Sequence, residues 1–123
     1  MHDIPCPCCG FLTLEGEYGS YAICPVCDWE DDPVQLANPA SAGGANSRSL
    51  AEAQSAAMAR YPASVEVAGG YGRSSGWRPL SSAELEAANA RRAVKHWYAT
   101  AIVLEPEAYW RVNENGASSE PAA

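Results

Sequence analysis

The sequence is poor in basic side chains. Lys and Arg together number 8 against 15 Asp and Glu, which gives a formal net charge of -7. Residues 1–48 hold seven of the acidic residues and only Arg48 as a base, a balance of -6. Such a negative field repels a phosphate backbone, so the composition disfavours direct binding of nucleic acid by the N-terminal segment.

Long apolar runs are also missing. The longest run, residues 99–104, includes Thr100 and is far shorter than the ~20 residues that cross a bilayer. Residues 1–5 have neither a basic start nor an apolar stretch of signal-peptide length. We therefore expect a cytoplasmic protein with no membrane partner, in which cysteines bind metal rather than form disulfides.

Four of the five cysteines form two copies of one motif, Cys-Pro-x-Cys. Cys6 and Cys9 make the first unit, and Cys24 and Cys27 make the second, with 14 residues between the units. In such a knuckle, two thiolates face the same ion across a tight turn, and backbone amides hydrogen-bond the sulfurs. Four soft ligands in a closed shell suit tetrahedral zinc, so we predict one structural Zn²⁺ per chain and no catalytic activity.

Two alternatives stay open for the cysteines. Iron held by the same four sulfurs, as in rubredoxin, would make the chain a redox protein. Cys8 occupies the free position of the first knuckle, where it is an inert side chain, a reactive thiol beside the metal, or a replacement for Cys9. Val26 at the equivalent place of the second knuckle favours the inert interpretation.

Turn and cap signals organise the rest of the chain. Apolar runs at 11–14 and 18–23 predict a β-hairpin that leads from one knuckle to the other. Asp32-Pro33 predicts a short helix that ends before Pro39. Capping boxes at 49–52 and 81–84 predict two longer helices, the first to about Tyr61 and the second to Thr100 or beyond. The glycine-rich residues 69–76 are typical of a mobile loop.

These elements predict an α+β fold. We expect a small zinc-ribbon-like β-hairpin module with two zinc knuckles, packed with two to three α-helices. Residues 1–112 form a single domain in this prediction, with the knuckle module at 1–40 and a mainly helical part at 41–112. Residues 113–123 are small and polar and are predicted to be a disordered tail.

An ordered set of motifs matches a known family. CPCCG, then CPVC followed by WEDD, Gln35, and GGANSRSL followed by Glu52 resemble the cysteine-rich CPCC family of small bacterial proteins, over roughly residues 5–61. The resemblance implies a compact zinc-ribbon-like module and no particular activity. Asp28 stands where the family pattern leads us to expect an apolar or aromatic residue, and Gln54 where it leads us to expect arginine.

The acidic surface suggests a function in protein recognition. We expect a protein-interaction module, in one version an immunity or antitoxin-like protein that masks a partner with a basic surface. A nucleic-acid-binding zinc ribbon is an alternative function, although the negative charge disfavours it. Glu30, Asp31 and Asp32 form the tentative partner-binding face. The structural alternative is that Asp32 caps the short helix and Asp31 is a favourable charge near its start.

Overall fold

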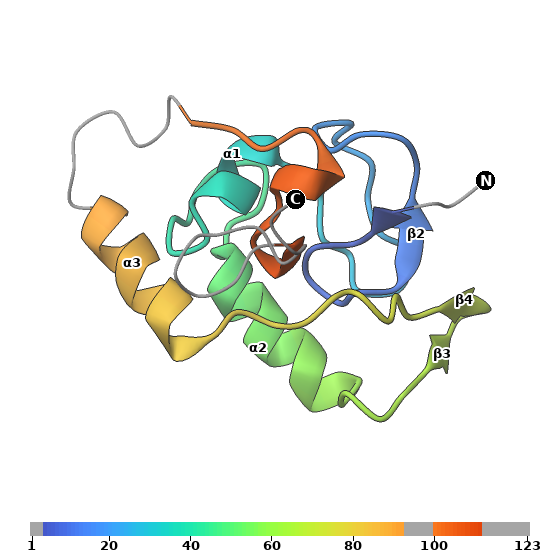
Figure 1. The fold of residues 1–123 in the computed structure, drawn as a ribbon. Helices are drawn as coiled ribbons and strands as arrows, with labels where there is room; N and C mark the ends of the chain where they lie inside the picture. The colour runs from blue at the N-terminus through green and yellow to red at the C-terminus, as the bar shows by residue number, and fades with distance from the viewer. Residues whose placement is uncertain (1–3, 93–99, 112–123) are drawn as a thin grey trace, which may run out of the picture.

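The computed structural model describes residues 4–92 and 100–111 (Figure 1). Helices and short antiparallel strand pairs make a small α+β arrangement, as predicted. The predicted tail at 113–123 lies outside the described residues. The elements, in chain order, are β1 (Ile4–Pro5), β2 (Leu12–Leu14), α1 (Pro33–Ala37), α2 (Leu50–Arg60), β3 (Val67–Ala68), β4 (Tyr71–Gly72), α3 (Ser82–Arg92) and the 3-10 turns η2 (Glu105–Glu107) and η3 (Tyr109–Arg111).

The strand pairing differs from the predicted hairpin. β2 pairs with β1, with Ile4 opposite Leu14, so the first knuckle is the turn of its own small hairpin. The second knuckle does the same through an isolated bridge between Ile23 and Glu30. The prediction that residues 11–14 pair with residues 18–23 is therefore wrong. Each knuckle already reverses the chain, and the nearest strand lies across that same turn, where loop closure costs least.

The helix starts agree with their cap signals. Asp32 Oδ1 accepts hydrogen bonds from the backbone N–H groups of Val34 (2.8 Å) and Gln35 (3.1 Å), and α1 ends at Ala37. Ser49 and Glu52 form the predicted capping box of α2. α3 begins at the predicted box too, but Thr100 is not helical, so the helix does not extend as far as predicted.

The residues predicted as a mobile loop include the turn and the second strand of a short hairpin. β3 and β4 pair antiparallel across Gly69 and Gly70, whose φ angles of 59° and 87° are readily adopted only by glycine. Two glycines at positive φ are what a tight two-residue hairpin turn requires. This hairpin lies next to the first strand pair, with contacts between β2 and β4.

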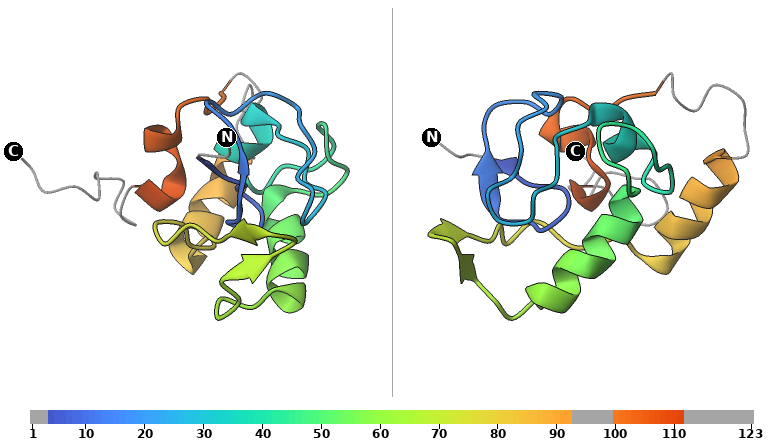
Figure 2. Two further views of the ribbon diagram at one scale, coloured as in Figure 1. Left: turned by 90° about the vertical axis from the view of Figure 1, so that its right-hand side faces the viewer. Right: turned by 180° about the vertical axis from the view of Figure 1, so that it is seen from behind.

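The last described segment, residues 100–111, returns to the N-terminal part of the chain. The N–H of Ile102 donates to the carbonyl of Pro33 (3.0 Å), and the N–H of Tyr18 donates to that of Val103 (2.7 Å). Trp110 then packs edge-on against the Tyr18 ring, with centroids 5.9 Å apart. Figure 1 shows these turns beside the N-terminal loops, and α3 lies at the opposite end of the molecule there and in the right-hand view of Figure 2.

One core joins the knuckles to α2 and the C-terminal turns. Leu50 and Ala57 of α2 are buried in it. The other buried members are Ile4, Cys6, Cys8, Cys9, Phe11, Leu14, Tyr18, Cys24, Val26, Trp29, Leu36, Trp77, Ala108 and Trp110.

No helix among residues 4–92 and 100–111 is long and apolar enough to cross a membrane.

Gln35 organises the connector between α1 and α2. Its buried Nε2 donates to the carbonyls of Ser41 (3.1 Å), Asn46 (3.2 Å) and Arg48 (3.0 Å). Its Oε1 accepts from the backbone and side-chain amides of Asn46 at 3.0 and 2.9 Å. One side chain thus replaces the regular hydrogen bonds that this segment lacks.

We predict that Gln35→Leu lowers the free energy of unfolding by about 3 kcal/mol, because it leaves one buried and two partly buried carbonyls without this donor. Ser55→Ala, on the exposed side of α2, is the control and should change it by less than about 0.5 kcal/mol. Denaturant unfolding of the metal-loaded protein measures both, and equal effects would contradict this role of Gln35.

Candidate metal centre

The two knuckles have the same backbone geometry. In the first, the N–H of Cys6 donates to the carbonyl of Phe11 (2.9 Å), and that of Gly10 donates back to Cys6 (2.8 Å). In the second, Cys24 donates to Trp29 and Asp28 donates back to Cys24, both at 2.9 Å. The residue after each unit has a positive φ, 80° at Gly10 and 68° at Asp28. The repeated motif therefore codes for a repeated turn.

The fold brings the four predicted ligands together. The Sγ atoms of Cys6 and Cys27 lie 3.6 Å apart, and those of Cys9 and Cys24 lie 3.8 Å apart. All four sulfurs lie within 4.8 Å of one another. Tetrahedral zinc with bonds of about 2.3 Å places its sulfurs about 3.8 Å apart, so this spacing fits one ion.

Two donors reach the sulfur of Cys24. The backbone N–H of Val26 donates to it at 3.4 Å, and the hydroxyl of Thr13 lies 3.2 Å from it. Donors of this kind disperse the negative charge of a thiolate and hold it in place. Val26 belongs to the knuckle turn, but nothing in the sequence pointed to Thr13.

The thiols compete for negative charge. Hydrogen bonds from neighbouring thiols, Cys24 first, hold the pKa of Cys27 far below its ordinary value, whereas burial raises the pKa of Cys6. The four thiols are therefore close enough to change one another's pKa values. A divalent cation bound to all four sulfurs offsets part of the charge of four thiolates, and sulfur is a soft ligand, so the donor set fits a soft metal ion.

These observations agree with a comparison of the sequence with known families. The profile of the cysteine-rich CPCC family matches residues 4–70. The chain belongs to this family. No curated protein matches the chain. The match to the CPCC family includes both knuckles, α1, α2 and the first of the two strands after them, and it ends before Arg73 and Trp77.

Two side chains cover the first knuckle of this CPCC protein, Gln54 from within the family match and Trp77 from beyond it. A Cβ added to Gly10 would lie 2.3 Å from the Trp77 ring, which shows how closely the indole covers the turn. The Nε1–H of Trp77 donates to the carbonyl of Pro7 at 3.3 Å, and the Nε2–H of Gln54 donates to the same carbonyl at 3.0 Å. Gln54, a departure from the expected pattern, therefore binds the cysteine turn directly.

Arg73 adds a positive charge beside the same knuckle. Its Nε donates to the carbonyl of Cys9 (3.0 Å), and its guanidinium lies over the Phe11 ring at 4.3 Å. The other guanidinium nitrogens donate to the carbonyls of Tyr61, Pro62 and Val65. Sequence analysis missed this residue because it sits in a segment that was predicted to be a loop, where no local pattern marks a long-range contact.

The fifth thiol lies beside the site but outside the group of four. Cys8 is buried, and its pKa is raised, chiefly by a hydrogen bond with Cys27 and then by burial. Its sulfur is not among the four that cluster closely enough to share one ion. This placement agrees with the interpretation that Cys8 fills the free position of the knuckle.

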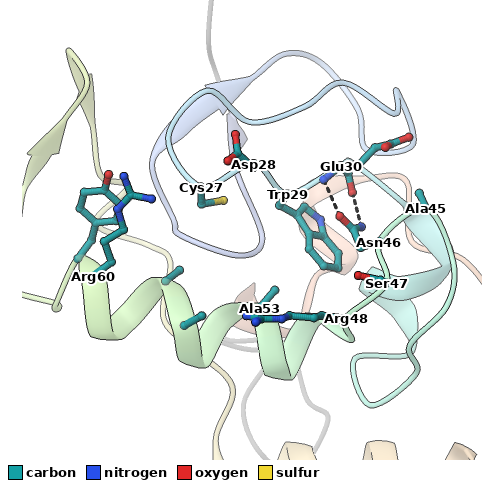
Figure 3. Close-up of a pocket in the computed structure, with 13 residues that line it drawn as sticks. Cys27, Asp28, Trp29, Glu30, Ala45, Asn46, Ser47, Arg48, Ala53 and Arg60 are labelled. Atoms are coloured by element: carbon teal, nitrogen blue, oxygen red, sulfur yellow. Dashed lines mark hydrogen bonds between the residues drawn. The ribbon is translucent and has the colours of Figure 1, made fainter.

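The second knuckle is more open than the first. Cys27 is half-buried, whereas the other three members of the cluster are buried. Its turn and α2 border a pocket of about 390 Å³, with Cys27 on the knuckle side and Ala53 on the helix side (Figure 3). We call this the Cys27 pocket; its lining includes Cys27, Asp28, Glu30, Arg48, Ala56 and Arg60.

The acidic residues after the second knuckle do not form the predicted face. Asp31 is buried, and its Oδ2 accepts hydrogen bonds from the N–H of Gly19 (2.9 Å) and from the N–H (2.9 Å) and hydroxyl (2.7 Å) of Ser20. Asp32 is also buried, as the cap of α1. These carboxylates hold the chain together, and only Glu30 of the three is partly exposed.

The two equivalent turn positions should respond in opposite ways to substitution. Gly10→Ala should destabilise the protein by about 2–5 kcal/mol, because the new Cβ meets the Trp77 ring and positive φ disfavours side chains. Asp28→Gly removes a side chain from positive φ and should leave stability unchanged or raise it by up to about 1 kcal/mol. Thermal or denaturant unfolding measures both. A large loss in Asp28→Gly would show that the carboxylate has a structural role of its own.

Proposed function

We propose that this CPCC protein binds one structural Zn²⁺ through Cys6, Cys9, Cys24 and Cys27 and acts as a non-catalytic protein-interaction module. The observation that carries the metal assignment is the convergence of four sulfurs from two identical turns within 4.8 Å. Four thiolates fill the coordination shell of tetrahedral zinc. No position is then left for a substrate or a reactive water.

A structural role for the ion also follows from the size of the surrounding elements. The strands next to the knuckles are two and three residues long, too short to be stable alone. Zinc binding to four cysteines contributes folding free energy to such modules. A cytoplasmic location belongs to this proposal, since a reducing compartment keeps the thiols available for the metal.

Exposed apolar side chains support the interaction role. Tyr21 and Ile23 precede the second knuckle and are 51% and 62% exposed. Tyr21 has a φ of 59°, a conformation that is uncommon for a bulky residue. The net charge of -7 would favour a partner with a basic surface, as the antitoxin-like version of the proposal requires.

Iron in the same site is the second candidate. Paired cysteine turns and an N–H hydrogen bond to a ligand sulfur, here from Val26 to Cys24, also suit an iron centre held by four thiolates. The outcome of metal analysis separates the two functions. A red protein with iron would support electron transfer, and a colourless protein with zinc would support the structural role.

We predict one zinc per chain, measured by elemental analysis of the native protein. Cys→Ser changes at position 6, 9, 24 or 27 should lower the zinc content and the melting temperature, because each removes a ligand. Cys8→Ser is the matched control and should keep the metal. Loss of zinc only with Cys8→Ser would show that the ligand set is different.

The interaction proposal predicts a role for Ile23 in binding. Ile23→Asp should weaken binding to the partner at least tenfold without changing the zinc content, because it places a charge in an apolar contact. Titration against purified products of neighbouring genes measures this. Val67→Asp is the control, because Val67 lies in β3, away from the second knuckle, and is 63% exposed. If both substitutions weaken binding equally, or neither does, Ile23 is not part of the interface.

A further inference from the structure

The Cys27 pocket is the open side of a site that is otherwise closed. Trp77, Gln54 and Arg73 cover the first knuckle, and the sulfurs of that knuckle and of Cys24 are buried. Cys27 is half-buried and lines the pocket. A molecule that approaches the four sulfurs from solvent through this pocket therefore meets Cys27 first.

Two arginines and two carboxylates line the pocket, and the arginines lie at the two ends of α2, where they can attract an anionic molecule. Arg48 precedes α2 and Arg60 ends it; both are exposed, and neither guanidinium donates a hydrogen bond to any residue within 4–92 or 100–111. Arg60 lies over the Tyr61 ring at 5.3 Å, which positions it at the pocket. Asp28 and Glu30 also line the pocket, but they lie on the knuckle side and their carboxylates point away from α2 (Figure 3). Two guanidinium groups are thus available to bind a carboxylate.

We propose that the Cys27 pocket binds a small carboxylate-bearing disulfide and that Cys27 is the residue it modifies. The Cys27 thiolate attacks one sulfur of the bound disulfide, a new sulfur–sulfur bond forms, and the old one breaks. The departing thiolate takes a proton from solvent. Cys27 is oxidised and the departing half of the disulfide is reduced, so the electrons balance and the protein carries a mixed disulfide.

The modification has a defined consequence, which depends on the proposed metal site. A sulfur in a mixed disulfide is no longer a thiolate ligand, so the shell of four falls to three and the ion is released more readily. A reducing thiol reverses the step and restores the ligand. Cys27 would in this way couple the presence of an anionic disulfide to the integrity of the knuckle module.

The test compares three small disulfides of similar size on the zinc-loaded full chain: dithiodipropionate (anionic), hydroxyethyl disulfide (neutral) and cystamine (cationic). Mass mapping should find Cys27 modified first. The anionic reagent should react about fivefold faster than the neutral one, as expected for an exposed charge pair, and the cationic reagent slowest. Arg48→Gln and Arg60→Gln should reduce this preference. Arg92→Gln, at an exposed arginine outside the pocket lining, makes the same charge change and should keep it.

Ala56→Leu provides a second test, because it fills the pocket from an exposed helix position. It should slow the reaction of all three reagents at Cys27.

Two results would overturn the proposal. One is that another cysteine is modified before Cys27; the other is that Arg60→Gln and Arg92→Gln show the same preference for the anionic reagent. Zinc content is measured beforehand. A chain without zinc would refute the proposed metal function, while the order of modification would still decide whether the pocket directs reagents to Cys27.

Discussion

The convergence of four cysteine sulfurs is the constraint on which the rest of this structure depends. Each knuckle uses its own backbone hydrogen bonds to turn two sulfurs to one side, and the pairs then meet across 3.6 and 3.8 Å. Unpaired thiolates at this spacing repel one another, so the arrangement favours a cation that all four share. The neighbouring strands are very short, and the core is built around the knuckles rather than beside them.

Around this centre, polar side chains hydrogen-bond the backbone of two regions, the loops next to α1 and the first knuckle. Asp31, Asp32 and Gln35 replace regular secondary structure: they hold loops by accepting or donating hydrogen bonds to backbone groups. Arg73 and Gln54 do the same for the first knuckle. Side chains that already hydrogen-bond the backbone in this way are poor candidates for partner contacts. Recognition is therefore more reasonably sought at exposed apolar residues such as Ile23.

The two halves of the metal centre differ in access although their turns are the same. The first knuckle is covered by Trp77, which lies seven residues past the end of the family match. The second faces α2 across a pocket that contains two arginines, in a chain that is acidic overall. This asymmetry arises in packing and not in the motif, because Gly10 admits the Trp77 indole against its backbone, whereas Asp28 at the equivalent position lines the Cys27 pocket.

The sequence by itself determined the local features: the ligand set that the structure gathers, the caps of α1, α2 and α3, and the end of α1 before Pro39. Each depends on residues within a few positions, where side-chain chemistry and backbone preference act directly. Only the tertiary structure decided which strands pair, how Asp31 is buried, and which side of the site is open. Those outcomes rest on contacts between residues up to 70 positions apart, such as Trp77 with Pro7. Such contacts form only when the whole chain packs, so no local sequence pattern predicts them.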